Sequence, residues 1–96
     1  EPIIIFKKHQ KWEKLISAYR YQGYYYIRQR KAEQSIATYK TAIKIATEHL
    51  GSNSSHILIL YQKLGIGYFY LLEYDIAVKY FLKSISYFNK MKDTPL

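Results

Sequence analysis

The stretch that decides the fold is YQKLGIGYFYLLEYDIAVKYFLKS, residues 61–84. Its aromatic, small and aliphatic residues recur every three or four positions, which places them on one face of an α-helix. Gly65 and Ala77 lie where two backbones would have to approach each other closely. Tyr68 and Phe81 supply the bulk that would fill the space beside them. The pattern predicts two amphipathic helices packed face to face.

The same periodicity continues through the rest of the chain. We expect helices at about 9–28, from a break near Gln29 to Leu50, at about 55–72 and at about 74–91. Because the connections near residues 30 and 73 are very short, each pair of helices should run antiparallel. The residues expected to face inward are Trp12, Ile16, Tyr19, Gly23 and Tyr26; Ala32, Ile36, Tyr39, Ile43, Ala46 and Leu50; Tyr61, Leu64 and Tyr68; and Tyr74, Ala77, Val78, Phe81, Ile85 and Phe88.

Three local signals mark the ends of these helices. Gly51 follows the second one, as a C′ glycine should. Ser52-Asn53-Ser54-Ser55 is a turn cluster in which each residue could cap the third helix. The apolar run in residues 2–8 fits either a strand or the end of a helix, so its structure stays open.

The two halves of the chain repeat each other. Residues of like size recur 42 positions apart, which indicates two copies of one helical hairpin and hence a solenoid. The matched pairs are Tyr19 and Tyr61, Gly23 and Gly65, Tyr26 and Tyr68, Ser35 and Ala77, Ile36 and Val78, Tyr39 and Phe81, Ala42 and Ser84, and Ile43 and Ile85.

The pattern Y-x-x-L-G-x-x-Y from Tyr61, followed by Tyr74-x-x-Ala77-Val78-x-x-Phe81, resembles the tetratricopeptide repeat. Leu50-Gly51 between the two units resembles the longer-period variant of kinesin light chains and bacterial peptide-sensing regulators. The resemblance implies an all-α fold of antiparallel helical hairpins, a fragment of a right-handed α-solenoid. We expect residues 1–96 to form one domain, with repeats at about 9–50 and 54–92, that belongs to a longer array.

The resemblance also implies a function, because the first helix of each such hairpin lines a concave groove. By register, the groove residues would be Ser17, Arg20, Tyr24, Ile27 and Arg28 in the first unit, and Ile59, Gln62, Ile66, Phe69 and Tyr70 in the second. Such a surface suits a protein or peptide ligand, and Arg20 and Arg28 could hold an acidic group. Arg20 and Tyr24 do not reproduce the Lys/Asn clamp of the chaperone-binding members. The aromatic groove residues could instead be covered by a neighbouring repeat.

Composition leaves few other functions open. The chain has no cysteine, three histidines without the spacing of a zinc pair, and no nucleophile elbow or phosphate-binding glycine loop. We therefore expect no catalytic residue, metal or cofactor. The longest wholly apolar runs are far shorter than the about 20 residues that span a membrane. The missing cysteines favour a cytoplasmic protein.

The net charge of +8 keeps one alternative open. Tyrosines and clustered cations such as Lys7, Lys8, Lys11 and Lys14 could bind nucleic acid as a basic helical repeat. Most of the tyrosines, however, occupy positions expected in the core. Two repeats are also fewer than usually stand alone, so the end helices should be covered by further repeats, by a partner or by self-association.

Overall fold

The structure is a computed structural model that describes the backbone of residues 2–51 and 54–93 and the side chains of residues 8–51 and 54–92. Within these ranges the chain forms four helices and no strand: α1 (Pro2–Arg28), α2 (Ala32–His49), α3 (Ser55–Tyr70) and α4 (Tyr74–Asp93). The all-α architecture is as expected. The first helix is longer than predicted, because the ambiguous residues 2–8 are helical.

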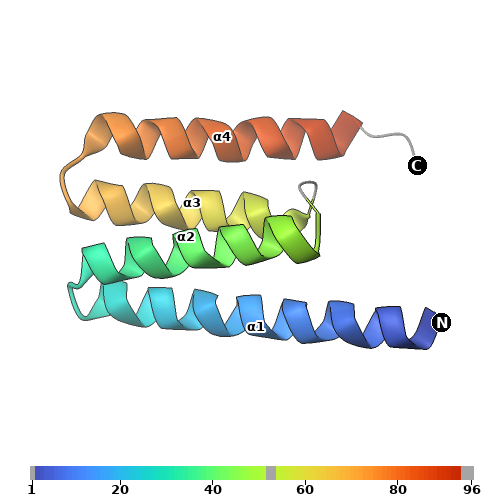
Figure 1. Ribbon diagram of the computed structural model, residues 1–96. Coiled ribbons are helices and arrows are strands. Elements are labelled where there is room, and N and C mark those ends of the chain that lie inside the picture. The colour runs from blue at the N-terminus through green and yellow to red at the C-terminus, as the bar shows by residue number, and fades with distance from the viewer. Residues whose placement is uncertain (1, 52–53, 94–96) are drawn as a thin grey trace.

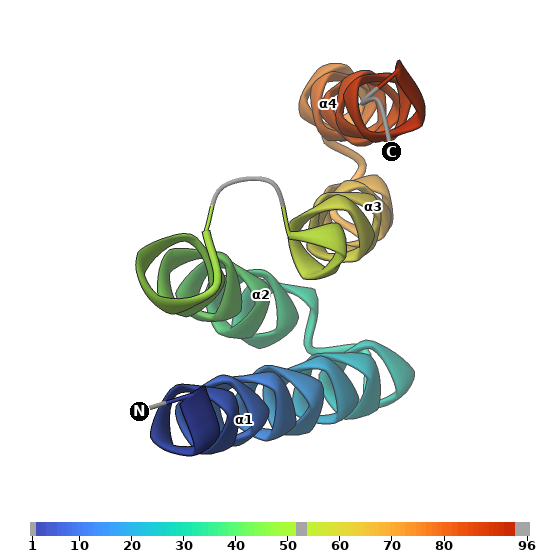
Figure 2. The ribbon, with the colours of Figure 1, turned by 90° about the vertical axis from the view of Figure 1, so that its right-hand side faces the viewer.

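The helices form an elongated stack measuring 47 × 29 × 16 Å, in which each helix packs against the next in sequence (Figure 1). Both short hairpin turns lie at one end of the stack, and the loop between α2 and α3 lies at the other (Figure 1). The end-on view shows the helices in a zigzag, with α1 and α4 farthest apart (Figure 2). Besides its extensive contact with α2, α1 also meets α3 over a small area. Paired helical hairpins thus stack side by side, as a solenoid requires.

The turn between α1 and α2 ends the first helix with a left-handed residue. Lys31 N–H donates to the Tyr26 carbonyl oxygen at 2.8 Å, and Arg30 N–H donates to that of Ile27 at 3.0 Å. Arg30 has a φ of 63°, in the region that favours glycine. These features define a Schellman motif, which satisfies the last carbonyl groups of a helix.

The turn between α3 and α4 repeats this motif 42 residues later. Glu73 N–H donates to Tyr68 at 3.0 Å, Leu72 N–H donates to Phe69 at 3.0 Å, and Leu72 also has a φ of 63°. The two hairpins therefore have the same turn geometry at positions 42 residues apart.

A glycine lets the helices of each hairpin approach. A Cβ added to Gly23 would lie 2.5 Å from the Tyr39 ring, and one added to Gly65 would lie 2.5 Å from the Phe81 ring. The rings therefore lie directly over the glycine backbone, as the sequence predicted. Tyr39 is almost wholly buried, at 1% exposure.

A serine hydroxyl also joins the two helices of each hairpin. Ser35 Oγ donates to the Gly23 carbonyl oxygen at 2.8 Å, and Ser84 Oγ donates to that of Leu58 at 3.2 Å. Both serines are buried, so these bonds satisfy hydroxyl groups that would otherwise be costly to bury. The two serines occupy different places in the repeat, since Ala77 and Ala42 stand at the equivalent positions.

The two hairpins are joined through α2 and α3. Ile57, Leu60 and Leu64 of α3 are each at most 1% exposed and form the core with residues of α1 and α2. A Cβ on Gly67 would lie 2.8 Å from Ile36, so α2 approaches α3 closely there. Gly65 and Gly67 thus serve helix packing on two sides of α3.

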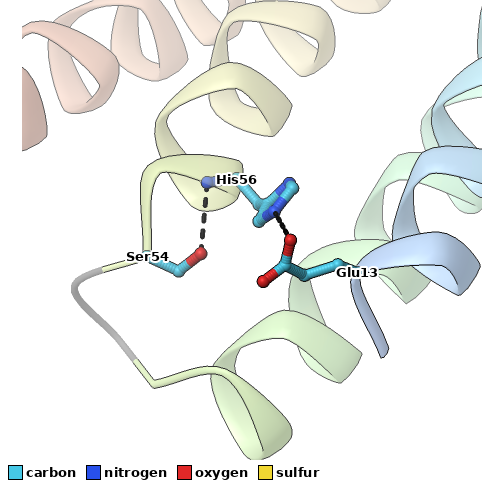
Figure 3. Close-up of polar contacts among 3 residues, drawn as sticks. All are labelled: Glu13, Ser54 and His56. Atoms are coloured by element: carbon cyan, nitrogen blue, oxygen red, sulfur yellow. Dashed lines mark hydrogen bonds and ion pairs between the residues drawn. The ribbon is translucent and has the colours of Figure 1, made fainter. Parts of the chain in front are cut away.

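Caps at the α2–α3 connection match the sequence signals. Gly51 has a φ of 93° and follows the end of α2. Ser54 is the N-cap of α3, and its hydroxyl accepts a hydrogen bond from His56 N–H at 3.2 Å (Figure 3). Ser52 and Asn53, which we also expected to be able to cap, lie outside the described residues.

One prediction for the fourth helix is wrong. Ala77 faces α3 and is buried, and Phe81 lies over Gly65. The other four residues expected to face inward are more than half exposed: Tyr74, Val78, Ile85 and Phe88. Among the described elements, α4 packs only against α3, so a second apolar side of this helix has nothing to cover it.

The α3–α4 interface is completed by tyrosines that the periodicity only partly identified. Tyr68 and Tyr80 stack in parallel with ring centroids 5.4 Å apart, and Tyr61 contacts both Tyr80 and Tyr87. Lys83 lies over the rings of Tyr61 and Tyr80 at about 5.5 Å. Burial raises the pKa of Tyr61, with the neighbouring tyrosines adding to the shift. These tyrosines hold the hairpin together, which makes them unsuitable as a base-stacking platform.

Candidate functional site

A small depression of about 180 Å³ lies between α1 and α3. Ser17, Arg20, Tyr21 and Tyr24 line it from α1, and Lys63 lines it from α3. In the described part of the chain, neither Arg20 nor Lys63 forms an ion pair, and no carboxylate lines this depression. The Nε of Arg20 is buried without a hydrogen-bond partner. Two cations therefore flank a hollow that a carboxylate could enter.

A larger, open depression of about 970 Å³ lies at the end of the stack that holds the hairpin turns. Its lining comes from the end of α1, from the turn between α1 and α2 together with the start of α2, and from the end of α3. The residues of α1 and of the α3 end are Tyr24, Ile27, Arg28, Tyr70 and Leu71. Arg30 and Lys31 add positive charge, and Glu33 adds one negative charge.

Tyr24 lines both depressions, so they adjoin along α1. Its hydroxyl accepts a hydrogen bond from Arg28 Nη1 at 3.2 Å, and this bond raises the pKa of Arg28. The guanidinium carbon lies 5.8 Å from the Tyr24 ring centroid. Arg28 is therefore oriented by Tyr24, one helical turn away. The two arginines that we expected to hold one acidic group belong to different depressions.

The structure brings together the groove residues of the first unit more completely than those of the second. All five from α1 line one of the two depressions, whereas Tyr70 alone does so from α3. Phe69 instead contacts the rings of Tyr70 and Tyr74. The depressions described here do not include the other three expected groove residues: Ile59, Gln62 and Ile66.

Sequence reasoning missed Lys63, the residue that α3 contributes to the small depression. Its counterpart 42 positions earlier is Tyr21, which lines the same depression and was also missed. The repeat shows only that these two residues occupy equivalent positions on α1 and α3; that they line one depression depends on how the two helices pack. Tyr24 and Tyr70 are 50% and 61% exposed, so no described element covers these aromatic rings.

Two of the three histidines contact residues of α1. His49 stacks on Trp12 with centroids 3.7 Å apart, and His56 Nε2 lies 3.9 Å from Glu13 Oε2, which links α3 to α1 (Figure 3). Among the described residues there is no group of three or more acidic, histidine or cysteine side chains that could hold a metal ion. None of the helices, within those residues, is long and apolar enough to cross a membrane.

Comparison with known proteins agrees with this geometry. A family model described as tetratricopeptide repeat matches residues 14–90. Neither the curated proteins nor the solved structures gave a match. The matched region includes both glycine-centred hairpins, both Schellman turns and the α2–α3 interface. The chain belongs to the tetratricopeptide repeat family.

Proposed function

We propose that this chain is a non-enzymatic module that binds a protein or peptide along the face where α1 and α3 adjoin. The family supports a role in protein–protein interaction. The observation that carries the choice of face is the pair of adjoining depressions, joined at Tyr24 and lined by exposed aromatic and cationic groups. Aromatic side chains bury large areas at low entropy cost, and arginine supplies a fork of donors to acidic groups.

An acidic ligand suits this face best. Arg20 and Lys63 lack acidic partners among the described residues, and the chain carries a net charge of +8. A carboxylate in the small depression would receive charge-assisted hydrogen bonds, which are roughly twice as strong as neutral ones. The ligand chain could then continue past Tyr24 toward Arg28 and Tyr70. We keep Ile59, Gln62, Ile66 and Phe69 as a predicted extension of this surface on α3.

Peptides selected from a random display library against the whole chain would test this assignment. The best binder should lose about tenfold or more in affinity with Arg20→Ala and Lys63→Ala, by fluorescence anisotropy. Lys44→Ala removes an equal charge from an exposed position of α2 that lines neither depression, and it should change the affinity less than about twofold. Far-ultraviolet circular dichroism should be unchanged in all three variants. Binding that survives the loss of both Arg20 and Lys63 would refute the acidic site.

Nucleic-acid binding is the second candidate, favoured by one observation. Arg28, Arg30 and Lys31 gather at the larger depression beside Tyr70. Phosphate contacts by these cations would make affinity for an oligonucleotide fall steeply with salt. A single-stranded 12-mer titrated at two salt concentrations tests this candidate. A steep loss of affinity at the higher salt would support it, and no binding at the lower salt would refute it.

We infer further that residues 9–50 and 54–92 act as two repeats of one domain. The 42-residue spacing of the turns supports the longer-period variant, and with it a peptide-sensing role like that of the bacterial regulators. The cytoplasmic location and the longer array stay predictions.

A further inference from the structure

A second apolar surface lies on α4, apart from the α1–α3 face. We call it the outer stripe: Tyr74, Val78, Leu82, Ile85 and Phe88. These side chains are 52–59% exposed and step by four, four, three and three residues, so they share one side of the helix. No described element covers them, although contiguous exposed apolar patches are uncommon in proteins without a binding role.

The repeat shows which kind of element packs on such a surface, because the equivalent side of α2 is covered by α3. Ile36 is the counterpart of Val78, 42 residues earlier, and is only 7% exposed. It lies against Gly67 of α3, where an added Cβ would be 2.8 Å away. The α2 surface is thus covered by a helix that runs antiparallel to it (Figure 1). The outer stripe continues this established interface by one repeat.

The outer stripe is bulkier than the α2 surface. Ala32 and Ala46 are buried in the stack, whereas Tyr74 and Phe88 stand at the equivalent positions of α4. Leu82 stands at the position of α4 that is equivalent to Lys40 of α2, and Lys40 is exposed. Since close packing needs large residues opposite small ones, a helix that covers α4 must present smaller side chains than α3 does.

We propose that the outer stripe binds a partner helix that runs antiparallel to α4 and presents small side chains to it. A glycine lies opposite Val78, and alanine-sized residues lie opposite Tyr74 and Phe88. Lys79 lies on the exposed side of α4, so acidic residues along the edge of the partner helix complement the charge.

A second copy of the chain fits this surface poorly. If two outer stripes packed on each other, large side chains would lie opposite large side chains. The two molecules would also repel each other, because each carries a net charge of +8. The outer side of α1 has Gln22 and Tyr25 where α3 has Leu64 and Gly67. If α1 of a second copy packed on α4 as α3 packs on α2, Tyr25 would collide with Val78 at the position that needs a glycine. The Gln22 side chain would also be buried without water to hydrogen-bond it.

A designed helical peptide of about 18 residues tests the proposal. It carries Gly opposite Val78, Ala opposite Tyr74 and Phe88, leucines between them and glutamates along its edges. A control peptide has leucine at the Gly and Ala positions. We expect the first peptide to bind the whole chain, by fluorescence anisotropy, at least about tenfold more tightly than the control.

Variants of the chain locate the binding. Val78→Glu with Ile85→Glu should weaken peptide binding about tenfold or more, with circular dichroism unchanged because both residues are exposed. Ala18→Glu with Tyr25→Glu adds the same charge to the outer side of α1 and should change binding less than about twofold. Equal affinity for the two peptides, or equal loss in the two double variants, would overturn the proposal. So would a dimer of the unmodified chain, by light scattering, that only the α4 substitutions dissociate.

Discussion

The two hairpins share one backbone plan and differ in what covers them. In both, a glycine receives a ring of the facing helix, and in both the turn ends in a residue with a φ of 63°. In the first hairpin, α2 is packed between α1 and α3; in the second, α4 meets α3 alone among the described elements. Position in the stack, more than residue type, therefore decides which apolar side chains are buried.

The largest expected effect is on the free energy of unfolding, and it appears when Leu64 and Gln22 are each replaced by alanine. These two residues occupy equivalent positions on α3 and α1. Leu64 is 1% exposed, so Leu64→Ala should lower the free energy of unfolding by about 3 kcal/mol through lost burial and a cavity. Gln22 is exposed, and Gln22→Ala should stay within about 0.5 kcal/mol of the unmodified chain. Urea denaturation followed by circular dichroism measures both. Similar losses at the two positions would mean that the outer side of α1 is covered in solution.

The next effect tests the contact that the hairpins share. Gly23→Ala and Gly65→Ala each place a methyl group against a ring, which should cost about 1–2 kcal/mol after the gain in helix propensity. The loss should be larger at Gly23, because the buried Tyr39 has less room to move than the half-buried Phe81. Denaturant midpoints measure this difference. The matching double variant Gly65→Ala with Phe81→Leu should recover part of the loss; a strictly additive result would show that the ring does not oppose the methyl group.

A smaller effect of opposite sign is expected at the hairpin turns. Arg30 and Leu72 adopt a left-handed conformation that costs a non-glycine residue roughly 1–2 kcal/mol. Both side chains are exposed, so Arg30→Gly and Leu72→Gly should each raise stability by about 1 kcal/mol in thermal denaturation. Gln29→Gly, one position earlier and without a positive φ, is the control and should give no gain. Equal stabilisation of the two hairpins would reflect their equal turns.

Much of this comparison could be predicted from sequence, because periodicity reports local geometry. The 42-residue offset identified both hairpins and the glycines at their interfaces, and the place of Gly51 just after the second helix identified it as a C′ glycine. The exposure of Val78 and Phe88 could not be predicted, since an apolar stripe has the same spacing whether or not another helix covers it. The structure of residues 2–8 stayed open between a strand and a helix, because a short apolar run fits both. Lys63 was missed because its place in the small depression depends on how two separate helices cross.

The smallest expected effect is a loss of stability at alkaline pH, which should also differ between the two hairpins. Tyr39 of α2 is almost wholly buried, and burial raises its pKa above the ordinary value of 10.0. In this pH range the unfolded chain loses the phenolic proton before the folded chain does, so stability falls as pH rises from about 10 through the raised pKa. Tyr39→Phe keeps the ring over Gly23 and removes the titrating group. The decrease in melting temperature between pH 8 and pH 10.5 should therefore be smaller in this variant. Phe81, its counterpart in α4, has no hydroxyl group, so the alkaline response of this position belongs to the first hairpin alone. An unchanged decrease in Tyr39→Phe would show that Tyr39 does not cause the response; Tyr61, whose pKa burial also raises, would then be the next residue to replace by phenylalanine.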